Sequence, residues 1–407
     1  MNALARNFEV AEVVTGAIAD VAANDSVALA PAAFLPGSAM IDRAALTSAF
    51  ALVKSVAEKR NTIPILSNAA LLANGAAMVV VTTDLDMEIR VTVPAAIDAH
   101  FAITAPAHLL ESILKKAAKG DLVSLTTREN SLLVEIERAK FDVQSLPVAD
   151  FPSLDAGEFQ NEFVLPGKTL WGMLDGTMGA ISTEETRYYL NGVYAHTVER
   201  GNWCGFTLVA TDGHRLYRTE IESPIGAMGM PGAIIPRKLV DYAHKLLRGK
   251  ACPESVSLAF SGNRVRLAFD NVEILSKLVD GTFPDYQRVI PTGNDKPMAF
   301  DRDAMAEALQ SVSIIASERG RAVKLVIDGG KCTLVVQNPD AGRAESEFAV
   351  AWDADFLEIG VNAIYLKEIL DDAGAGEVTM EFADCGSPVR ITGQREGWDA
   401  ALMPMRL

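Results

Sequence analysis

The sequence predicts an α+β protein made of three repeated domains, each with two helices packed on antiparallel sheet. Three observations support this fold class. The chain has 407 residues, enough for two to four domains of ordinary size. A unit of one amphipathic helix followed by alternating strands recurs six times along the chain. Successive units also resemble one another in pairs, and each sheet must bury one face under its helices.

The six predicted helices begin at nearly regular intervals, about 60 to 70 residues apart. Their expected starts are near Ile41, Ala105, Pro166, Pro236, Asp301 and Asn362. In the first helix, Leu46, Phe50, Val53 and Ala57 recur with helical spacing and should share one buried face. Pro166 and Pro236 suit the first turn of a helix, and Asp301 suits an N-cap.

Alternating apolar residues next to glycine turns predict the strands. Val265, Leu267 and Phe269 alternate after Gly262-Asn263. A second set, Val323, Leu325 and Ile327, alternates before Gly329-Gly330. Period-two alternation beside such a turn is typical of a β-hairpin.

Short motifs mark the ends of unit pairs and set the predicted domain boundaries. Thr83-Asp84 and Thr211-Asp212 each follow an apolar strand, with Asn338 as a weaker third copy. Phe151-Pro152, Phe283-Pro284 and Met403-Pro404 close successive pairs. We therefore predict domains over residues 40–160, 161–293 and 294–407. Residues 1–39 are rich in Ala and Val, lack the repeat, and are interpreted as an N-terminal extension.

Composition excludes several classes of protein. Hydrophobic residues make up 49% and charged residues 22% of the chain, which is typical of a globular protein and not of a disordered one. Apolar runs fall far short of the ~18 residues of a membrane span, and Glu9, Glu12 and Asp20 interrupt a possible signal peptide. We expect a cytoplasmic protein with no membrane partner.

The four cysteines, Cys204, Cys252, Cys332 and Cys385, are widely spaced and form no C-x-x-C pair. This spacing excludes a zinc knuckle and a redox motif. We expect buried thiols, with no cofactor and no metal.

The net charge of -16 conceals an uneven distribution. The predicted helix over residues 236–250 carries five cations, Arg237, Lys238, Lys245, Arg248 and Lys250, against Asp241 alone. The helices over residues 42–60 and 105–119 are also net basic, so the helical layer is basic relative to an acidic remainder. Such a layer could attract phosphates without reading bases, or could simply be a set of solvated helix faces.

The sequence contains few motifs that could carry catalysis. Gly167-Lys168-Thr169 resembles the end of a phosphate-binding loop, but Glu162 stands where the motif needs glycine. The histidines lack metalloprotease spacing. The segment Thr211 to Leu216 combines Asp212, His214 and Arg215, which suits either acid-base chemistry or a turn at a strand end. No catalytic residue is predicted.

Several local strings together identify a family. They are Arg60 to Leu66, Arg187 to Gly192, Ala210 to Leu216, Ile235 to Lys238, Phe283 to Tyr286 and the terminal Met403 to Leu407. In this order and spacing the chain resembles the bacterial sliding clamps, the β subunits of DNA polymerase III, over residues 40–407. The resemblance implies three clamp domains that form a ring as a head-to-tail dimer. It also implies a non-catalytic processivity factor that encircles duplex DNA without sequence preference.

The resemblance also implies three kinds of site. The DNA-touching residues would be Arg60, Tyr188, Tyr189 and Lys238. The dimer interface would join Phe141 and Val143 to Ile315 and Ala316 of a second copy, although these could be ordinary core residues. A peptide-binding groove would be formed by Leu190, Thr211, Gly213, His214, Arg215, Leu216, Pro284, Arg288, Val289, Asn362, Tyr365, Val389, Met403, Pro404, Met405 and Arg406.

The implied partners are duplex DNA, the clamp loader, the replicative polymerase catalytic subunit, repair polymerases and other proteins with a clamp-binding motif. One alternative is a clamp-like peptide-binding scaffold that is never loaded on DNA. An enzyme that depends on Asp212 or His214 is a further alternative.

Overall fold

The computed structural model describes residues 36–59, 62–116, 120–155, 157–315 and 322–406. The chain forms two compact units. One contains the residues up to Phe159 together with Val256–Lys277, and the other contains Gln160–Ser255 with Leu278–Leu407. Most of the predicted extension, residues 1–35, lies outside the described part of the chain.

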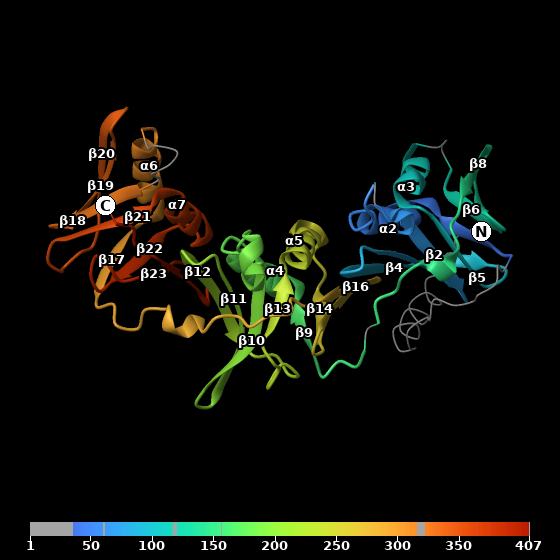
Figure 1. Ribbon diagram of the computed structural model, residues 1–407, viewed down its shortest axis with the longest axis horizontal. Helices are drawn as coiled ribbons and strands as arrows, with labels where there is room; N and C mark the ends of the chain where they lie inside the picture. The colour runs from blue at the N-terminus through green and yellow to red at the C-terminus, as the bar shows by residue number, and fades with distance from the viewer. Residues whose placement is uncertain (1–35, 60–61, 117–119, 156, 316–321, 407) are drawn as a thin grey trace, which may run out of the picture. The chain divides into compact units, whose positions relative to one another are not determined.

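Six α-helices occur within the described residues, and each begins one or two residues after its predicted start. They are α2 (Arg43–Val53), α3 (Ala107–Lys116), α4 (Gly167–Met178), α5 (Arg237–Leu246), α6 (Arg302–Ser313) and α7 (Ala363–Asp372). The helices lie in neighbouring pairs, α2 with α3, α4 with α5 and α6 with α7 (Figure 1). This pairing supports the predicted repeat.

Side-chain caps explain several of these starts, and two predictions need correction. The Asp301 carboxylate accepts from Ala304 N at 3.0 Å, as predicted for an N-cap. Pro166 and Pro236 stand at the N-cap positions and not in the first helical turn. Ala57 is buried with the apolar face of the first helix, but α2 ends at Val53, so Ala57 packs from the segment that follows.

The first unit is built on antiparallel sheet. Its strands are β1 (Ser38–Asp42), β2 (Asn68–Asn74), β3 (Ala77–Thr83), β4 (Met87–Ile97), β5 (Phe101–Pro106), β6 (Leu122–Arg128), β7 (Ser131–Ile136), β8 (Ala139–Gln144), β14 (Ser255–Phe260), β15 (Arg264–Phe269) and β16 (Val272–Lys277). Along the sheet, neighbouring strands follow the order β8-β7-β6-β1-β4-β16-β15-β14. Strand β4 also pairs with β3, β3 with β2, and β2 with β5. Helices α2 and α3 pack on this sheet.

The second unit holds two antiparallel sheets. Strand β9 (Asn161–Pro166) belongs to neither of them. Their strands are β10 (Gly192–Arg200), β11 (Trp203–Thr211), β12 (Arg215–Glu222), β13 (Ala233–Pro236), β17 (Lys296–Asp301), β18 (Ala322–Asp328), β19 (Lys331–Asn338), β20 (Gly342–Ala349), β21 (Leu357–Asn362), β22 (Glu377–Phe382), β23 (Val389–Thr392) and β24 (Trp398–Leu402). Eight strands follow the order β13-β10-β11-β12-β24-β23-β22-β17, and four follow β20-β19-β18-β21.

The join between β12 and β24 makes the second unit continuous. Arg215 pairs with Leu402 and Thr219 with Trp398, so segments far apart in sequence share one sheet. Across this join, Arg218 donates two hydrogen bonds of 2.8 Å to the Asp399 carboxylate. Bidentate pairing of this kind fixes geometry as well as charge. The join therefore holds two repeats in a defined register.

The hairpin predictions are confirmed in detail. Strand β18 alternates with Val323, Leu325 and Ile327 buried. In β15, Val265 and Leu267 are buried and Phe269 is half-buried.

The cysteine prediction is partly wrong. Cys332 is buried, Cys204 and Cys252 are partly buried, and Cys385 is exposed. Cys385 stands in the connection from β22 to β23, where Asp384 accepts from Gly386 N and Ser387 N. Such a turn lies at the surface because its remaining backbone groups need water.

None of the helices in the described residues is long and apolar enough to cross a membrane.

Candidate peptide-binding pocket and nucleic-acid interface

A pocket of about 300 Å³ opens in the second unit. Its lining consists of Arg187, Tyr189, Leu190, Thr211, Gly213, Arg215, Leu216, Pro284, Tyr286, Val289, Ala401 and Met403. These residues come from four places in the sequence: the η3 segment (Glu185–Leu190), the β11–β12 turn, the segment around η5 (Tyr286–Arg288), and the C-terminal end. Most of the lining is apolar, which suits anchor side chains of a bound peptide.

Side-chain hydrogen bonds fix the turn between β11 and β12. Asp212 Oδ1 accepts from His214 N at 2.9 Å and from Arg215 N at 3.0 Å. Thr211 Oγ1 accepts from Gly213 N at 3.1 Å and donates to the Arg215 carbonyl at 2.6 Å. Gly213 has a φ of 88°, which favours glycine. The turn interpretation of this segment is therefore confirmed, and the Asp212 carboxylate is used to build it.

The same turn chemistry occurs in the other repeats. Asp84 Oδ1 accepts from Asp86 N and Met87 N. Asn338 Oδ1 accepts from Asp340 N at 2.9 Å, so the weaker third copy keeps one bond of this pattern. The short motifs that follow three apolar strands thus have one local structural cause.

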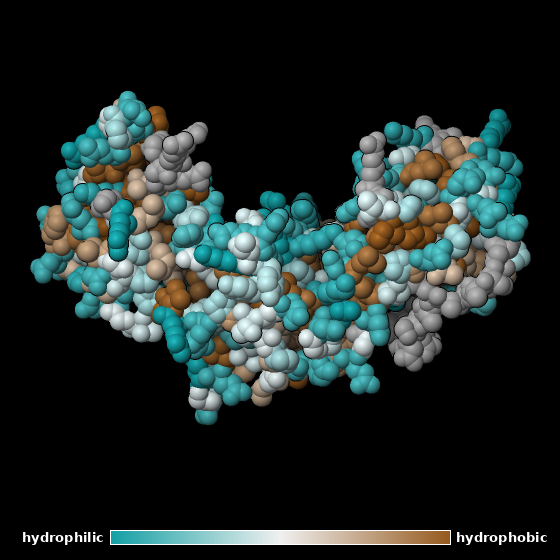
Figure 2. Space-filling view, viewed as in Figure 1, coloured by the Kyte–Doolittle hydropathy of each residue, from teal (hydrophilic) through white to brown (hydrophobic). Residues whose placement is uncertain are grey.

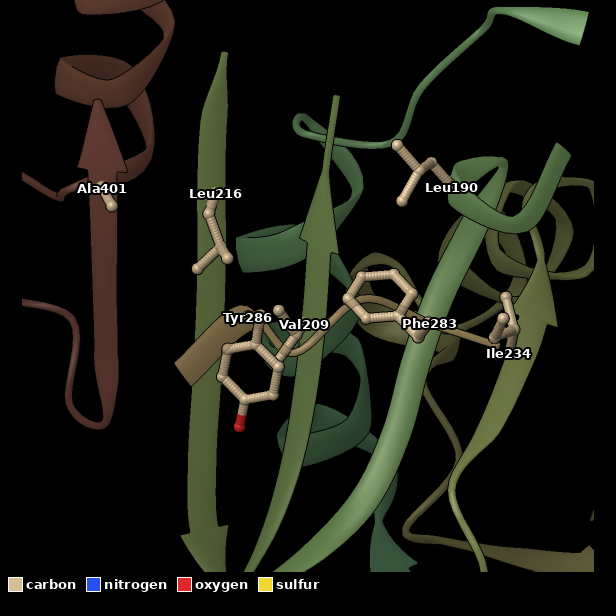
Figure 3. Packing of buried hydrophobic residues seen from close by; sticks show 7 residues of the cluster. All are labelled: Leu190, Val209, Leu216, Ile234, Phe283, Tyr286 and Ala401. Atoms are coloured by element: carbon tan, nitrogen blue, oxygen red, sulfur yellow. The ribbon is translucent and has the colours of Figure 1, made fainter. Parts of the chain in front are cut away.

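A cluster of buried side chains supports the pocket floor. It contains Leu190, Val209, Leu216, Ile234, Phe283, Tyr286 and Ala401. Figure 3 shows Ala401 and Leu216 on adjacent strands, with the rings of Tyr286 and Phe283 lying across the sheet. The Phe283 ring stacks on Tyr194 at a centroid distance of 4.8 Å. The floor is therefore a packed extension of the core.

A buried histidine lies beneath this floor. His196 Nε2 is 3.0 Å from the Tyr286 hydroxyl, and the His196 ring stacks on Tyr194. Burial lowers the pKa of His196 to about 4, although Glu220 raises it in part. The imidazole is therefore neutral near pH 7, and Tyr286 has a neutral hydrogen-bond partner.

The C-terminal end forms one pocket wall and is held in place by backbone hydrogen bonds. Met403 N donates to the His214 carbonyl at 2.9 Å, and Met405 N donates to Gly360 O at 2.8 Å. Met403 faces the pocket, whereas Met405 is held against β21. The two methionines of the terminal motif thus have different surroundings.

Comparison with known proteins places this chain in a family. Residues 38–155, 164–285 and 287–406 match the N-terminal, central and C-terminal domains of the DNA polymerase III beta subunit. The chain belongs to the DNA polymerase III beta subunit family.

Relatives named beta sliding clamp cover nearly the same span. The one from Caulobacter vibrioides is 42% identical over 370 residues, covering 90% of this chain and 99% of the relative. The one from Pseudomonas aeruginosa is 33% identical over 371 residues, with the same two coverages. Both relatives therefore lack a counterpart for about the tenth of this chain that the alignments leave unmatched.

Solved structures agree with these matches. The sliding clamp of Bartonella birtlesii bound to griselimycin superposes with a TM-score of 0.86 at 40% identity, covering 92% of this chain and all of that one. The Caulobacter crescentus clamp gives a TM-score of 0.86 at 41% identity, covering 91% of this chain and all of that one. The predicted fold of three clamp domains is confirmed.

The structure brings half of the sixteen predicted groove residues of this beta subunit into the pocket lining. These are Leu190, Thr211, Gly213, Arg215, Leu216, Pro284, Val289 and Met403. The other eight, His214, Arg288, Asn362, Tyr365, Val389, Pro404, Met405 and Arg406, lie outside the lining. Val389 is fully buried in the sheet core, and Asn362 caps α7 by accepting from Ile364 N and Tyr365 N. Their direct role in peptide binding stays a prediction.

Four lining residues, Arg187, Tyr189, Tyr286 and Ala401, were not predicted for the groove. Three of them, Arg187, Tyr189 and Tyr286, fall within the strings that carry the family resemblance. Membership in those strings could have indicated them. Ala401 carries no local signal, because it reaches the pocket only through its pairing with Leu216.

The predicted DNA-touching residues of the clamp have different surroundings. Tyr188 and Lys238 are exposed, whereas Tyr189 is half-buried and lines the pocket. Arg60 lies outside the described residues. All five cations of the 236–250 segment are exposed, and Figure 2 shows hydrophilic residues over α5. The DNA contacts stay predictions.

The predicted dimer residues are also unevenly exposed. Phe141 is half-buried on β8, while Val143 is 3% exposed and packs within its own unit. Ile315 is half-buried after the end of α6, and Ala316 lies outside the described residues. The dimer contact stays a prediction.

Among the residues that the structure describes, no cluster of His, Cys, Asp and Glu has the arrangement of a metal site.

Proposed function

We propose that this chain is a processivity clamp: two copies close into a ring around duplex DNA, and each pocket holds a peptide segment of a replication or repair protein. The observation that carries the proposal is the pocket, whose walls come from two repeats joined by the β12–β24 pairing. The clamp itself supplies no catalytic group. Its role is to keep a polymerase on DNA.

Peptide docking is supported by the chemistry of the lining. Leu190, Leu216, Val289 and Met403 offer apolar contact, and Thr211 and Tyr286 contribute a few polar atoms. A concave apolar site with few polar groups suits the anchor residues of an extended peptide. We propose that griselimycin, which is bound to the Bartonella birtlesii clamp, occupies this pocket too. The partners we propose are the clamp loader, the replicative polymerase and repair polymerases.

Ring closure is supported by two strands at sheet ends. Strand β8 stands at one end of the sheet of the first unit, and β20 stands at one end of the four-stranded sheet. A strand at a sheet end has backbone groups available for pairing with another chain. We propose that β8 of one copy and the region of β20 and Ile315 of a second copy meet head to tail. Repetition of this contact closes a two-subunit ring.

Encirclement of DNA is supported by the charge on α5 (Arg237–Leu246) and on the short segment that follows it. Arg237, Lys238, Lys245, Arg248 and Lys250 are exposed in a chain whose net charge is -16. Lysine and arginine attract phosphates without reading base sequence, which permits sliding. A ring that holds DNA by topology needs only weak contacts of this kind. We place this activity in the cytoplasm, together with replication.

Sedimentation equilibrium tests the ring. The chain mass is 43.6 kDa, and we expect a species near twice that mass across a wide range of protein concentration. The Phe141→Ala variant should shift the mass toward that of one chain. Val143→Ala is a poor substitute, because it removes packing within its own unit. A parent protein that stays monomeric at high concentration would contradict ring formation.

A further inference from the structure

Arg215 is held by four elements at the back of the pocket. Its Nε donates to Asp212 Oδ2 at 3.2 Å, and its Nη2 donates to the Gly179 carbonyl at 2.7 Å. Its Nη1 donates to the Tyr217 hydroxyl at 3.2 Å and to the Glu368 carboxylate. The side chain is 8% exposed. These partners belong to the β11–β12 turn, the C-terminal end of α4, strand β12 and helix α7.

An aromatic ring completes this enclosure. The guanidinium carbon of Arg215 lies 4.5 Å from the Tyr365 ring centroid, and Tyr365 in turn stacks on His214. A planar guanidinium commonly stacks on an aromatic face in this way. Arg215 has five N–H groups and makes four side-chain hydrogen bonds with these partners. It therefore has little hydrogen-bonding capacity left for a ligand. It therefore contributes to the pocket mainly through its side-chain stem.

Two of the groups that hold Arg215, Glu368 and Tyr365, come from α7, which contributes no residue to the pocket lining. We propose that Glu368 is a positioning residue for the peptide pocket, because it holds the Arg215 guanidinium against α7 and out of the space that a peptide fills. This inference rests on the proposed function, since peptide docking is what the positioning serves.

The physical reason is the cost of a buried cation that has lost one of its two carboxylate partners. Without the Glu368 carboxylate, one edge of the Arg215 guanidinium loses its charged acceptor, and a buried donor without an acceptor is unfavourable. The pocket is the open space that Arg215 lines, so the guanidinium regains hydration by turning into it. A hydrated cation there occupies volume and disfavours apolar anchors. Asp212 and Gly179 remain as partners, so the loss is partial.

The test compares two substitutions on the same helix. Glu368→Gln keeps the size of the side chain and removes its charge, whereas Asp371→Asn disrupts the exposed Lys367–Asp371 pair and leaves Arg215 untouched. Calorimetric titration with griselimycin should show affinity about 3- to 10-fold lower for Glu368→Gln and unchanged for Asp371→Asn. Both melting temperatures should stay near that of the parent, because Glu368 is partly exposed and such pairs add little stability.

A second pair of variants separates positioning from general destabilisation. Glu368→Asp keeps the negative charge and should bind griselimycin more tightly than Glu368→Gln, whereas Tyr365→Leu removes the ring that stacks on Arg215 and should bind more weakly than the parent. Parent-like affinity of Glu368→Gln would overturn the inference, whatever the effect of Tyr365→Leu. A parent protein that fails to bind griselimycin would instead contradict peptide docking itself, so the two failures are distinguishable.

Discussion

His196 Nε2 lies 3.0 Å from the hydroxyl of Tyr286, a residue that lines the peptide pocket. The pair connects strand β10 to the segment between two domains. It also places a titratable group, which the sequence did not single out, in the core beneath the pocket.

The stability of the protein should depend on His196 in acid. Burial lowers the pKa of His196 from 6.5 to about 4. The unfolded chain therefore binds a proton more readily than the folded chain between these two values. This contribution is fully present above pH 6.5 and is lost as pH falls toward 4, by about 3 kcal/mol in total. In His196→Gln, chemical denaturation across this range should show a smaller decrease in the free energy of unfolding.

His214→Gln is the matched control, because His214 is an exposed histidine of the neighbouring turn. The decrease in its free energy of unfolding with falling pH should match that of the parent. An identical decrease in the parent and in His196→Gln would contradict the role of His196 in the loss of stability in acid.

Asp372 should have the opposite pH dependence. Burial raises the pKa of Asp372 to about 6, with Asp175 adding to the rise and Arg395 opposing it. The folded state holds this proton more tightly, so stability is greatest at low pH and falls as pH rises from 3.8 to about 6. We expect Asp372→Asn to raise the free energy of unfolding at pH 8 by about 1 to 3 kcal/mol.

The neighbouring Asp371→Asn serves as the control for this prediction, since Asp371 is exposed and pairs with Lys367 at 2.9 Å. Its effect should be within about 0.5 kcal/mol. A loss of stability in Asp372→Asn at pH 8 would show that the ionised carboxylate is favourable where it lies.

The two methionines of the terminal motif should differ in their importance for ligand binding. Met403 is 38% exposed and faces the pocket, whereas Met405 lies outside the lining. Met403→Ala should weaken griselimycin binding about 5- to 30-fold with little change in melting temperature. Met405→Ala should bind like the parent. Equal losses in both variants would favour the sequence prediction, in which both methionines belong to the groove.

The α5 cations should affect loading on DNA more than peptide binding. Replacing Lys238 and Lys245 together by alanine removes two exposed positive charges and should lower the yield of loaded clamp several-fold at low salt, with a smaller difference from the parent at high salt, where screening weakens the phosphate contacts of both proteins. Lys331→Ala on β19, which breaks an exposed pair with Glu347, is the control. Loading yields can be measured with labelled clamp on primed circular DNA. Parent-like loading by the α5 double variant would argue against a DNA-facing role for this helix.

Local patterns in the sequence predict much of the fold because their causes are local. Helical spacing and capping residues such as Asp301 place all six helix starts within two residues. The Asp212 turn follows from the hydrogen bonds of one side chain. These features depend on few distant contacts.

The remaining features of the pocket depend on pairings between distant segments. Ala401 joins the lining because β24 pairs with β12, and Val389 is buried because β23 lies beside β24 in the same sheet. The Arg215 enclosure requires α4, β12 and α7 together. Exposure of Cys385 likewise depends on where its loop lies in the folded domain. No run of neighbouring residues encodes these outcomes.

The central claim, that the clamp encircles DNA, is tested most directly by its retention on circular and linear DNA. Labelled clamp is loaded on nicked circular DNA, separated from free protein by gel filtration, and then examined with and without cleavage of the circle by a restriction enzyme. We predict that clamp stays with intact circles and is released after linearisation, because it slides off the free ends. Equal retention on both forms would show that the protein binds DNA by contacts alone and would contradict encirclement.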